Sequence, residues 1–124
     1  SIGLFYSTFT QFLGFNVNEG ESKVMGLASY GKPIFKDFIL DKIISIKKDE
    51  IIIDETWFSF TSDPERSYSE KLENEFGIPG KAIDYSDFKS DKFARLANIA
   101  ASVQSATEEL IKILIANFVK KNIY

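Results

Sequence analysis

The chain of 124 residues, 44% hydrophobic and 15% aromatic, is long enough for one domain with a core of its own. Cysteine and histidine do not occur, which excludes disulfides, thiolate nucleophiles, Ser-His-Asp triads and Cys- or His-based zinc sites within the chain, and the lack of cysteine favours a cytoplasmic location. Its 15 basic and 18 acidic residues give a net charge of −3, which argues against a nucleic-acid partner because phosphate contacts need clustered Lys and Arg.

The first part of the chain, residues 1–42, is rich in phenylalanine and glycine. Apolar residues recur at helical spacing from about Leu4 to Leu13, and Gly14 can stop that helix. A second short helix is expected within residues 18–28, before the turn-forming run at 30–33, and a third over residues 34–40. The aromatic residues at this spacing are expected in the core rather than in a pocket: Phe5, Tyr6, Phe9, Phe12 and Phe15.

The middle part, residues 43–90, begins with two isoleucine-rich runs. Residues 43–46 and 51–53 flank a polar link at 47–50, which predicts a β-hairpin. Trp57, Phe58 and Phe60 then add a third strand or a covering flap, pack on the last helix, or form an interface. The pattern leaves these alternatives open.

A polar stretch over residues 61–90 contains one short expected helix, at about Ser67 to Phe76. Ser67 has the capping-box spacing to Glu70, and Ser69 is an alternative cap. Further on, acidic residues invite a comparison with metal ligands, but solvated loop acids are the favoured interpretation: Asp84, Asp87 and Asp91.

The last part, residues 91–124, is expected to form one long helix from about Ser90 or Asp91 to Lys121, because it lacks Gly and Pro. Its apolar stripe widens beyond Leu110 until it covers nearly the whole circumference, which is typical of a helix that is buried all round. We therefore expect a partner surface here, either a segment outside this sequence or a second copy. The apolar run at 110–119 falls short of the roughly 20 residues that a membrane span needs, so no membrane partner is expected.

The densest candidate site is the run from residue 18 to residue 33. A helix that begins near Gly20 offers free backbone N–H groups to an anion. Gly26 inside a helix costs about 1 kcal/mol relative to Ala, which indicates close approach by backbone or ligand, and Gly31 allows a left-handed turn. From spacing alone, the plainer interpretation of two turns around a short core helix is favoured.

At this point a family resemblance adds to the spacing. The runs SIGLFYSTFTQFLGF and NEGESKVMGLASYGKP strongly resemble the O-carbamoyltransferase family of nodulation-factor, cephalosporin and aminoglycoside biosynthesis, which carries a GE-x-K-x-MGLA-x-YG signature. The signature residues in this chain are Gly20, Glu21, Lys23, Met25, Gly26, Leu27, Ala28, Tyr30 and Gly31. Ala100, Ala101, Ser102 and Gln104 resemble a second family segment, and residues 43–90 show little resemblance.

The resemblance implies a fold and an activity. The chain is expected to be α+β, with short N-terminal helices, a small antiparallel hairpin or three-stranded sheet and a long C-terminal helix. Together these would be a piece of an actin, sugar-kinase and Hsp70-like nucleotide-binding domain. The parent enzyme would use ATP and carbamoyl phosphate to make a carbamoyl-adenylate, and would transfer the carbamoyl group to a hydroxyl of a sugar or secondary metabolite at a metal-containing site.

By the same resemblance, the expected nucleotide-binding residues lie in the signature. Glu21 is assigned to the ribose hydroxyls and Lys23 to ribose or phosphate oxygens, while Gly26, Tyr30 and Gly31 form the wall of the nucleotide or acceptor site. These assignments are chemically reasonable, because a carboxylate accepts two O–H bonds and an ammonium is a compact phosphate partner.

The family's metal-binding histidines, glycine-rich strand and adenylate-forming domain have no counterpart in this sequence. Residues 1–124 are therefore expected to be one fragment domain without catalytic or metal-ligating residues, inactive alone, whose partners are the rest of the parent enzyme and its hydroxyl acceptor. Two alternatives stay open. One is an interaction or dimerisation module that forms a homodimer through exposed apolar surface, and the other is a kinase or tRNA threonylcarbamoyl-transfer relative of the same fold.

Overall fold

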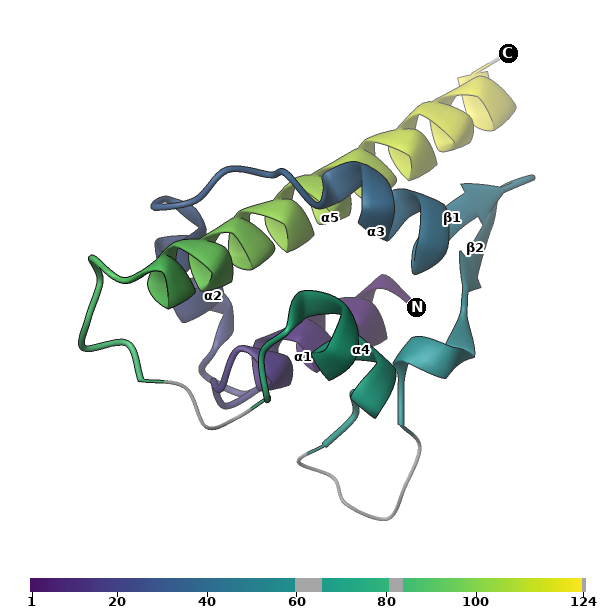
Figure 1. The fold of residues 1–124 in the computed structure, drawn as a ribbon. Coiled ribbons are helices and arrows are strands. Elements are labelled where there is room, and N and C mark those ends of the chain that lie inside the picture. Colours follow the sequence, from purple (N-terminus) through teal and green to yellow (C-terminus); the bar gives the residue numbers. More distant parts are fainter. Residues whose placement is uncertain (60–65, 81–83, 124) are drawn as a thin grey trace.

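The computed structural model describes residues 1–59, 66–80 and 84–123. They form an α+β structure in which a long helix is packed against shorter helices and a hairpin (Figure 1). The elements in chain order are α1 (Ile2–Phe12), α2 (Glu21–Ala28), α3 (Lys36–Lys42), β1 (Ile44–Lys47), β2 (Glu50–Ile53), the short 3₁₀ helix η1 (Glu55–Trp57), α4 (Glu70–Phe76) and α5 (Asp91–Ile123). The expected α+β class is confirmed.

The long C-terminal helix is confirmed as α5, of 33 residues. The Ser90 hydroxyl oxygen accepts a hydrogen bond from the Phe93 N–H (3.1 Å) at its start, and Lys120 and Lys121 lie in its last turn, where they complement the helix dipole. Its first two-thirds supply the spine of the core through fully buried side chains: Leu96, Ala97, Ile99, Ala100, Val103, Ala106 and Leu110.

Helix α1 supplies the aromatic part of the core, as its spacing predicts. Phe5, Phe9 and Phe12 are at most 1% exposed. Phe9 meets Phe76 of α4 edge-on, with ring centroids 6.1 Å apart, a favoured aromatic geometry. The helix begins at Ile2, two residues earlier than expected, because the Ser1 hydroxyl oxygen caps the Leu4 N–H (3.1 Å).

The second and third helices are present, but the third is displaced. Residues 34–40 were the expected range, whereas α3 begins at Lys36. The Phe35 N–H donates to the hydroxyl of Ser102 on α5 (2.9 Å), and this bond fixes Phe35 as the last residue before the helix.

The predicted hairpin is confirmed, with a tighter turn than expected. β1 pairs antiparallel with β2 from Ile44 opposite Ile53 to Lys47 opposite Glu50. Only Lys48 and Asp49 form the turn, with φ of 51° and 68°. Positive φ at both positions is the type I′ geometry that suits the strand twist of a two-residue hairpin.

Among the described residues the sheet stays two-stranded, so the third-strand alternative is wrong for Trp57 and Phe58. Trp57 lies in η1 and is buried, edge-on to Phe38 of α3 at 5.7 Å, while Phe58 makes a single bridge to Tyr68. Phe60 lies outside the described residues.

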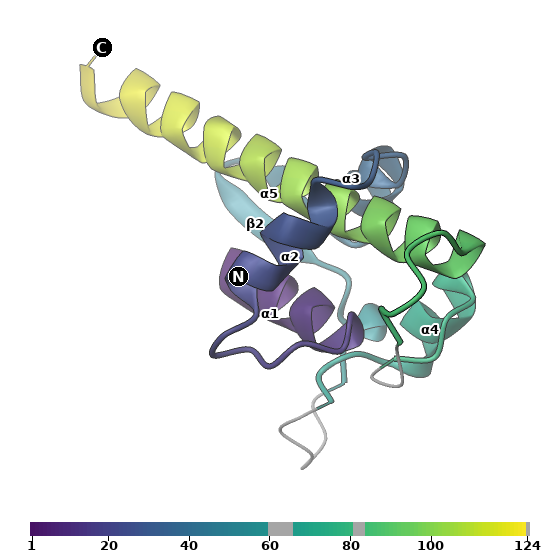
Figure 2. The same cartoon turned by 90° about the vertical axis from the view of Figure 1, so that its left-hand side faces the viewer.

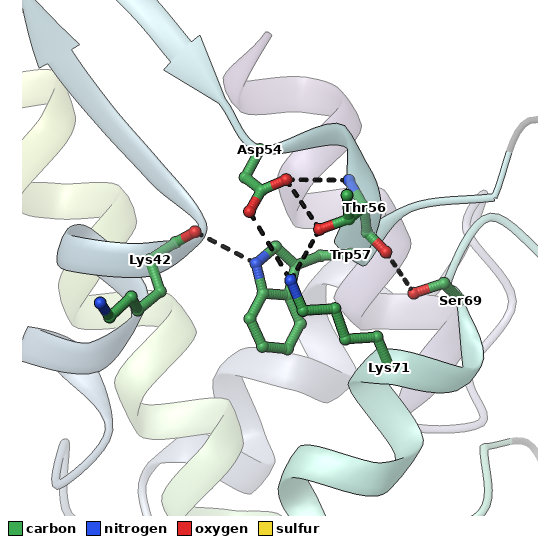
Figure 3. A network of polar contacts seen from close by, with 6 residues as sticks. All are labelled: Lys42, Asp54, Thr56, Trp57, Ser69 and Lys71. Carbon is green, nitrogen blue, oxygen red and sulfur yellow. Dashed lines mark hydrogen bonds and ion pairs between the residues drawn. The ribbon is translucent and has the colours of Figure 1, made fainter.

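A polar network fixes η1 between the hairpin and α4 (Figure 3). The Trp57 indole N–H donates to the Lys42 carbonyl (3.1 Å), and the Lys71 ammonium lies 4.1 Å from the centre of the indole ring. The same ammonium donates to the Thr56 hydroxyl (2.7 Å), which itself donates to Asp54 (2.7 Å). These contacts hold the segment against α3 and α4, where it adds no strand to the hairpin.

Of the two expected caps of the fourth helix, Ser67 is wrong, whereas the alternative, Ser69, is confirmed as the residue at the capping position. α4 begins at Glu70, and Ser69 occupies the capping position while its hydroxyl donates to the Thr56 carbonyl (2.7 Å). The Ser67 hydroxyl donates to the Gln11 side-chain carbonyl (2.6 Å), so it serves the contact with α1.

The end of α5 projects beyond α1–α4 (Figures 1 and 2). Ile111, Ile115 and Phe118 are 44%, 58% and 66% exposed, so the widened apolar surface predicted beyond Leu110 is largely open. No helix within the described ranges is both long enough and apolar enough to cross a bilayer.

Candidate functional site

The signature residues lie on the outer surface of α2 and on the turn that follows it. α2 buries Val24 and Leu27 against the core and leaves Glu21, Lys23 and Gly26 exposed. Beyond its end, the Tyr30 side chain is 76% exposed. The side chains of Glu21, Lys23 and Tyr30, which the sequence analysis assigned to ligand binding, are thus exposed and do not pack in the core.

Gly26 stands in open space. A Cβ added there would meet no atom within 4 Å, so no described part of the chain requires a glycine at this position. A mid-helix glycine nevertheless costs about 1 kcal/mol relative to alanine. The reason for a glycine here therefore lies outside the described contacts.

The other two signature glycines have packing reasons. A Cβ at Gly31 would overlap the Ala97 backbone of α5, and a Cβ at Gly20 would overlap Thr10 and the Asn16 carbonyl. Gly31 therefore permits α2 to end directly on α5, whatever further role it has in a ligand wall.

Hydrogen bonds join the turn after α2 to the second family-like segment. The Lys32 N–H donates to the Asn98 side-chain carbonyl (2.8 Å), and the Phe35 N–H donates to Ser102. Ser102 is fully buried and its own hydroxyl donates to the Asn98 carbonyl (2.6 Å). The two segments that carry the resemblance thus form one structural unit, a connection across about 70 residues that spacing within either segment does not contain.

Helical geometry separates the five predicted site residues into two groups. Successive helical residues turn by about 100°, so Lys23 and Gly26 share one flank of α2, whereas Glu21 lies about 160° away from Lys23; Tyr30 follows the helix, in the turn after it. A ligand that contacts both Glu21 and Lys23 must lie across the N-terminal end of α2 or across its exposed face.

Glu21 belongs to a polar group that sequence reasoning did not single out. The Tyr6 hydroxyl of α1 donates to the Gln104 side-chain carbonyl of α5 (2.9 Å). Burial, and to a smaller degree the charge of Glu21, raise the pKa of Tyr6, so Glu21 lies near this pair. The only sequence signal was that all three residues occur in family-like segments.

Tyr30, in the turn after α2, joins an aromatic group. It meets Phe93 edge-on with centroids 6.0 Å apart, and Phe88, which is 69% exposed, also contacts Phe93 (6.3 Å). Exposed aromatic rings beside Tyr30 can pack on a planar or apolar part of a ligand.

The loop acids act in local turns. Asp84 accepts from the Ser86 N–H (2.8 Å) and Asp87 from the Lys89 N–H (3.3 Å). The hydrogen bonds from Ser86 hold the pKa of Asp84 below its usual value. Over the described ranges no group of three or more acidic residues is placed to hold a metal ion.

A surface hollow also lies away from the signature, along α4 and the loop after it, and is lined by Glu70, Glu73, Asn74, Gly77, Ile78 and Pro79. Glu73 is already committed to Arg66 (3.0 Å) and to the Gly80 N–H (3.0 Å). The hollow is therefore separate from the signature residues, and its Glu73 carboxylate is held by partners within this chain.

The chain matches known proteins along almost its entire length. The family model described as "Carbamoyltransferase N-terminus" matches residues 1–123. An uncharacterized protein of Synechocystis sp. is 37% identical over 112 residues, which is 90% of this chain and 17% of that protein. An uncharacterized protein of Methanocaldococcus jannaschii is 44% identical over 52 residues, which is 41% of this chain and 8% of that protein.

The chain therefore spans less than a fifth of the length of either curated relative. No solved structure matches it.

Proposed function

This chain belongs to the family of carbamoyltransferase N-termini, and on that premise we propose that it is part of an O-carbamoyltransferase in which α2 forms one wall of the nucleotide site. The parent would derive a carbamoyl-adenylate from ATP and carbamoyl phosphate and pass the carbamoyl group to a hydroxyl of a sugar or secondary metabolite. The proposed larger fold is the actin, sugar-kinase and Hsp70-like one.

One observation carries the proposal. The signature helix commits only its inner face to folding and presents a carboxylate, an ammonium and a bare glycine outward, with an exposed tyrosine after it. A helix that served the core alone would gain stability from alanine at position 26. A close-fitting ligand is a physical reason to keep the glycine.

The chemistry of the exposed groups fits a nucleotide. Glu21 can accept hydrogen bonds from two ribose hydroxyls, and Lys23 can pair with phosphate oxygens. Gly26 would let the ligand reach the helix backbone, and Tyr30 would close the side of the site beyond the turn that Gly31 permits. The metal ion of the parent would be held elsewhere, since this chain contains no histidine.

The test is a titration of the full-length protein with ATP by calorimetry, comparing wild type with Gly26→Ala. The added methyl group should weaken ATP binding about tenfold, equivalent to about 1.4 kcal/mol, while it raises the free energy of unfolding by up to about 1 kcal/mol. Gly3→Ala is the matched control, because Gly3 is also an exposed helical glycine and its added Cβ would make only an ordinary 3.8 Å contact.

Absence of ATP binding in the wild-type protein, or unchanged binding in Gly26→Ala, would contradict the proposal. The isolated 124 residues should show no carbamoyl turnover, because the groups that activate and transfer carbamate would lie elsewhere. Turnover by the isolated chain would show that it is more than one wall of a site.

A further inference from the structure

A second group of polar residues lies beside the proposed nucleotide wall, where α1, α2 and α5 meet. Ala97, Ala101 and Gln104 are spaced i, i+4 and i+7 and therefore share one face of α5. Ala97 lies directly under Gly31 at the end of α2. α2 packs against α5, and the charge of Glu21, in the first turn of α2, acts on the Tyr6 hydroxyl of α1.

The side chain of Gln104 is oriented by α1. Its carbonyl oxygen accepts the 2.9 Å hydrogen bond from the partly buried Tyr6 hydroxyl, which leaves the amide nitrogen with two N–H groups to donate. No hydrogen bond from that nitrogen is found among the described residues. Glu21 is exposed, and its charge contributes, after burial, to the raised pKa of the same Tyr6 hydroxyl, so its carboxylate adds hydrogen-bond acceptors near this group.

The Glu21 carboxylate and the Gln104 amide together favour hydroxyl groups over phosphate as ligands. A carboxylate repels a phosphate, and Lys23 projects from the opposite flank of α2. A hydroxyl both donates and accepts, so neighbouring hydroxyls can donate to Glu21 and accept from Gln104 at once. The phosphates of a nucleotide would then extend toward Lys23.

We propose that Gln104, held by Tyr6, binds the ribose hydroxyls of the nucleotide together with Glu21. This inference rests on the proposed nucleotide site and adds two residues from outside the signature to it. Gln104 would contact the ligand directly, whereas Tyr6 would be a positioning residue.

The test compares ATP with 2′-deoxy-ATP and 3′-deoxy-ATP by calorimetry in the full-length protein. Wild type should bind ATP about tenfold more tightly than at least one deoxy analogue, because a missing hydroxyl leaves polar groups of the site unpaired. Gln104→Met keeps the length of the side chain and removes the amide, so it should weaken ATP binding while deoxy-analogue binding stays nearly constant. Tyr6→Phe should reduce the preference for ATP over the deoxy analogues, because it removes the hydrogen bond that orients Gln104. If Gln104→Met does not fold, the result for Tyr6→Phe tests the proposal.

Ser105→Ala is the control, since Ser105 is the next residue on α5 and has no role in the proposed pair; it should retain the wild-type preference. If wild type binds ATP but Gln104→Met and Tyr6→Phe keep the full preference for ATP, the Tyr6–Gln104 bond is only structural and this inference is wrong. If wild type binds no ATP, the proposed nucleotide site itself is wrong.

Discussion

The glycines of the signature are alike in sequence and different in surroundings. Gly20 and Gly31 are crowded by neighbouring backbone and side chains, whereas Gly26 faces open space. The first two let elements of this chain approach each other, and the third is available to something else. A motif can thus contain glycines that the packing of the chain requires beside one that the described packing does not require.

This difference predicts opposite effects of the same substitution. Gly31→Ala should lower the free energy of unfolding by about 3 kcal/mol, because its methyl group would overlap the Ala97 backbone and cannot be relieved by a rotamer change. Gly26→Ala should leave stability unchanged or raise it. Urea denaturation followed by circular dichroism measures both, and equal stabilities would contradict the packing that places α2 on α5.

Tyr85 predicts a pH dependence of stability. Its hydroxyl donates to the buried Leu13 carbonyl (2.5 Å) and its ring stacks on Phe15 (5.2 Å). Burial raises the pKa of Tyr85 well above its ordinary value, so folding favours the neutral phenol. The resulting stability is complete below the unfolded pKa of about 10 and declines as pH rises above it.

Tyr85→Phe should therefore lower stability at neutral pH by about 1–3 kcal/mol, since Leu13 loses its partner, and should flatten the decline above pH of about 10. Denaturant titrations over a series of alkaline pH values measure this. Tyr30→Phe, at an exposed ring, is the control and should retain the wild-type slope. A Tyr85→Phe protein with an equally steep alkaline decline would assign that decline to other groups.

At the scale of elements, the existence and order of the helices and the hairpin could be predicted, and their ends could not. Periodicity and the lack of Gly and Pro suffice for α1 and α5, because burial of one stripe is a property of the local sequence. Caps depend on which partner a hydroxyl finds. Ser67 does not cap α4 because its hydroxyl donates a hydrogen bond to the side chain of Gln11, 56 residues away. Phe35 stays outside α3 because its N–H donates to the hydroxyl of Ser102.

The same limit applies to the candidate site. Glu21, Lys23, Gly26, Tyr30 and Gly31 could be selected from the signature, and the exposure of four of them on α2 and its end agrees with a ligand surface. Tyr6 and Gln104 could not be joined to Glu21 in advance, because their contact spans 98 residues of sequence. Only the packing of α1 on α5 brings them together.

The segment around η1 offers a prediction for an element. Trp57 is the only tryptophan and fixes η1 through its bond to Lys42 and its contact with Phe38. Trp57→Phe should cost about 1–3 kcal/mol, from a lost hydrogen bond and lost packing. Lys71→Met should cost about 1 kcal/mol or less, because the cation–π contact and ion pair that it loses are partly exposed.

Circular dichroism in urea compares these variants without relying on indole fluorescence. The wild-type emission should also shift to longer wavelength in the same transition, because the buried indole becomes solvated on unfolding. If Lys71→Met lowered the free energy of unfolding more than Trp57→Phe, the polar contacts of Lys71, rather than the indole, would hold η1 in place.

At the scale of the whole molecule, α5 is asymmetric. Up to Leu110 it is the spine around which the other elements pack, and beyond that residue it carries exposed Ile, Phe and Val side chains. The hairpin contacts the C-terminal end of α5 through the ion pair of Asp49 with Lys121 (2.5 Å). The apolar surface left open is a physical reason to expect association, and the sequence predicts the surface without identifying what covers it.

The final prediction concerns that surface. Ile111, Ile115 and Phe118 lie at i, i+4 and i+7 and form one stripe, which can pack against the same stripe of a second chain. In an antiparallel pair centred between residues 114 and 115, Glu108 of one copy would face Lys121 of the other. The isolated chain should therefore associate with increasing concentration, and Ile115→Lys should shift it toward monomer by placing a charge at the centre of the stripe.

Light scattering over a range of concentrations measures the association. Asn74→Lys adds the same charge at an exposed position of α4 and should associate like wild type. A chain that stays strictly monomeric would contradict pairing through α5. If the isolated chain associates and the full-length protein does so regardless of Ile115→Lys, the stripe is covered within the longer protein. The exposed end of α5 then marks the surface on which the remainder of the longer protein packs, and the interaction-module alternative loses its main support.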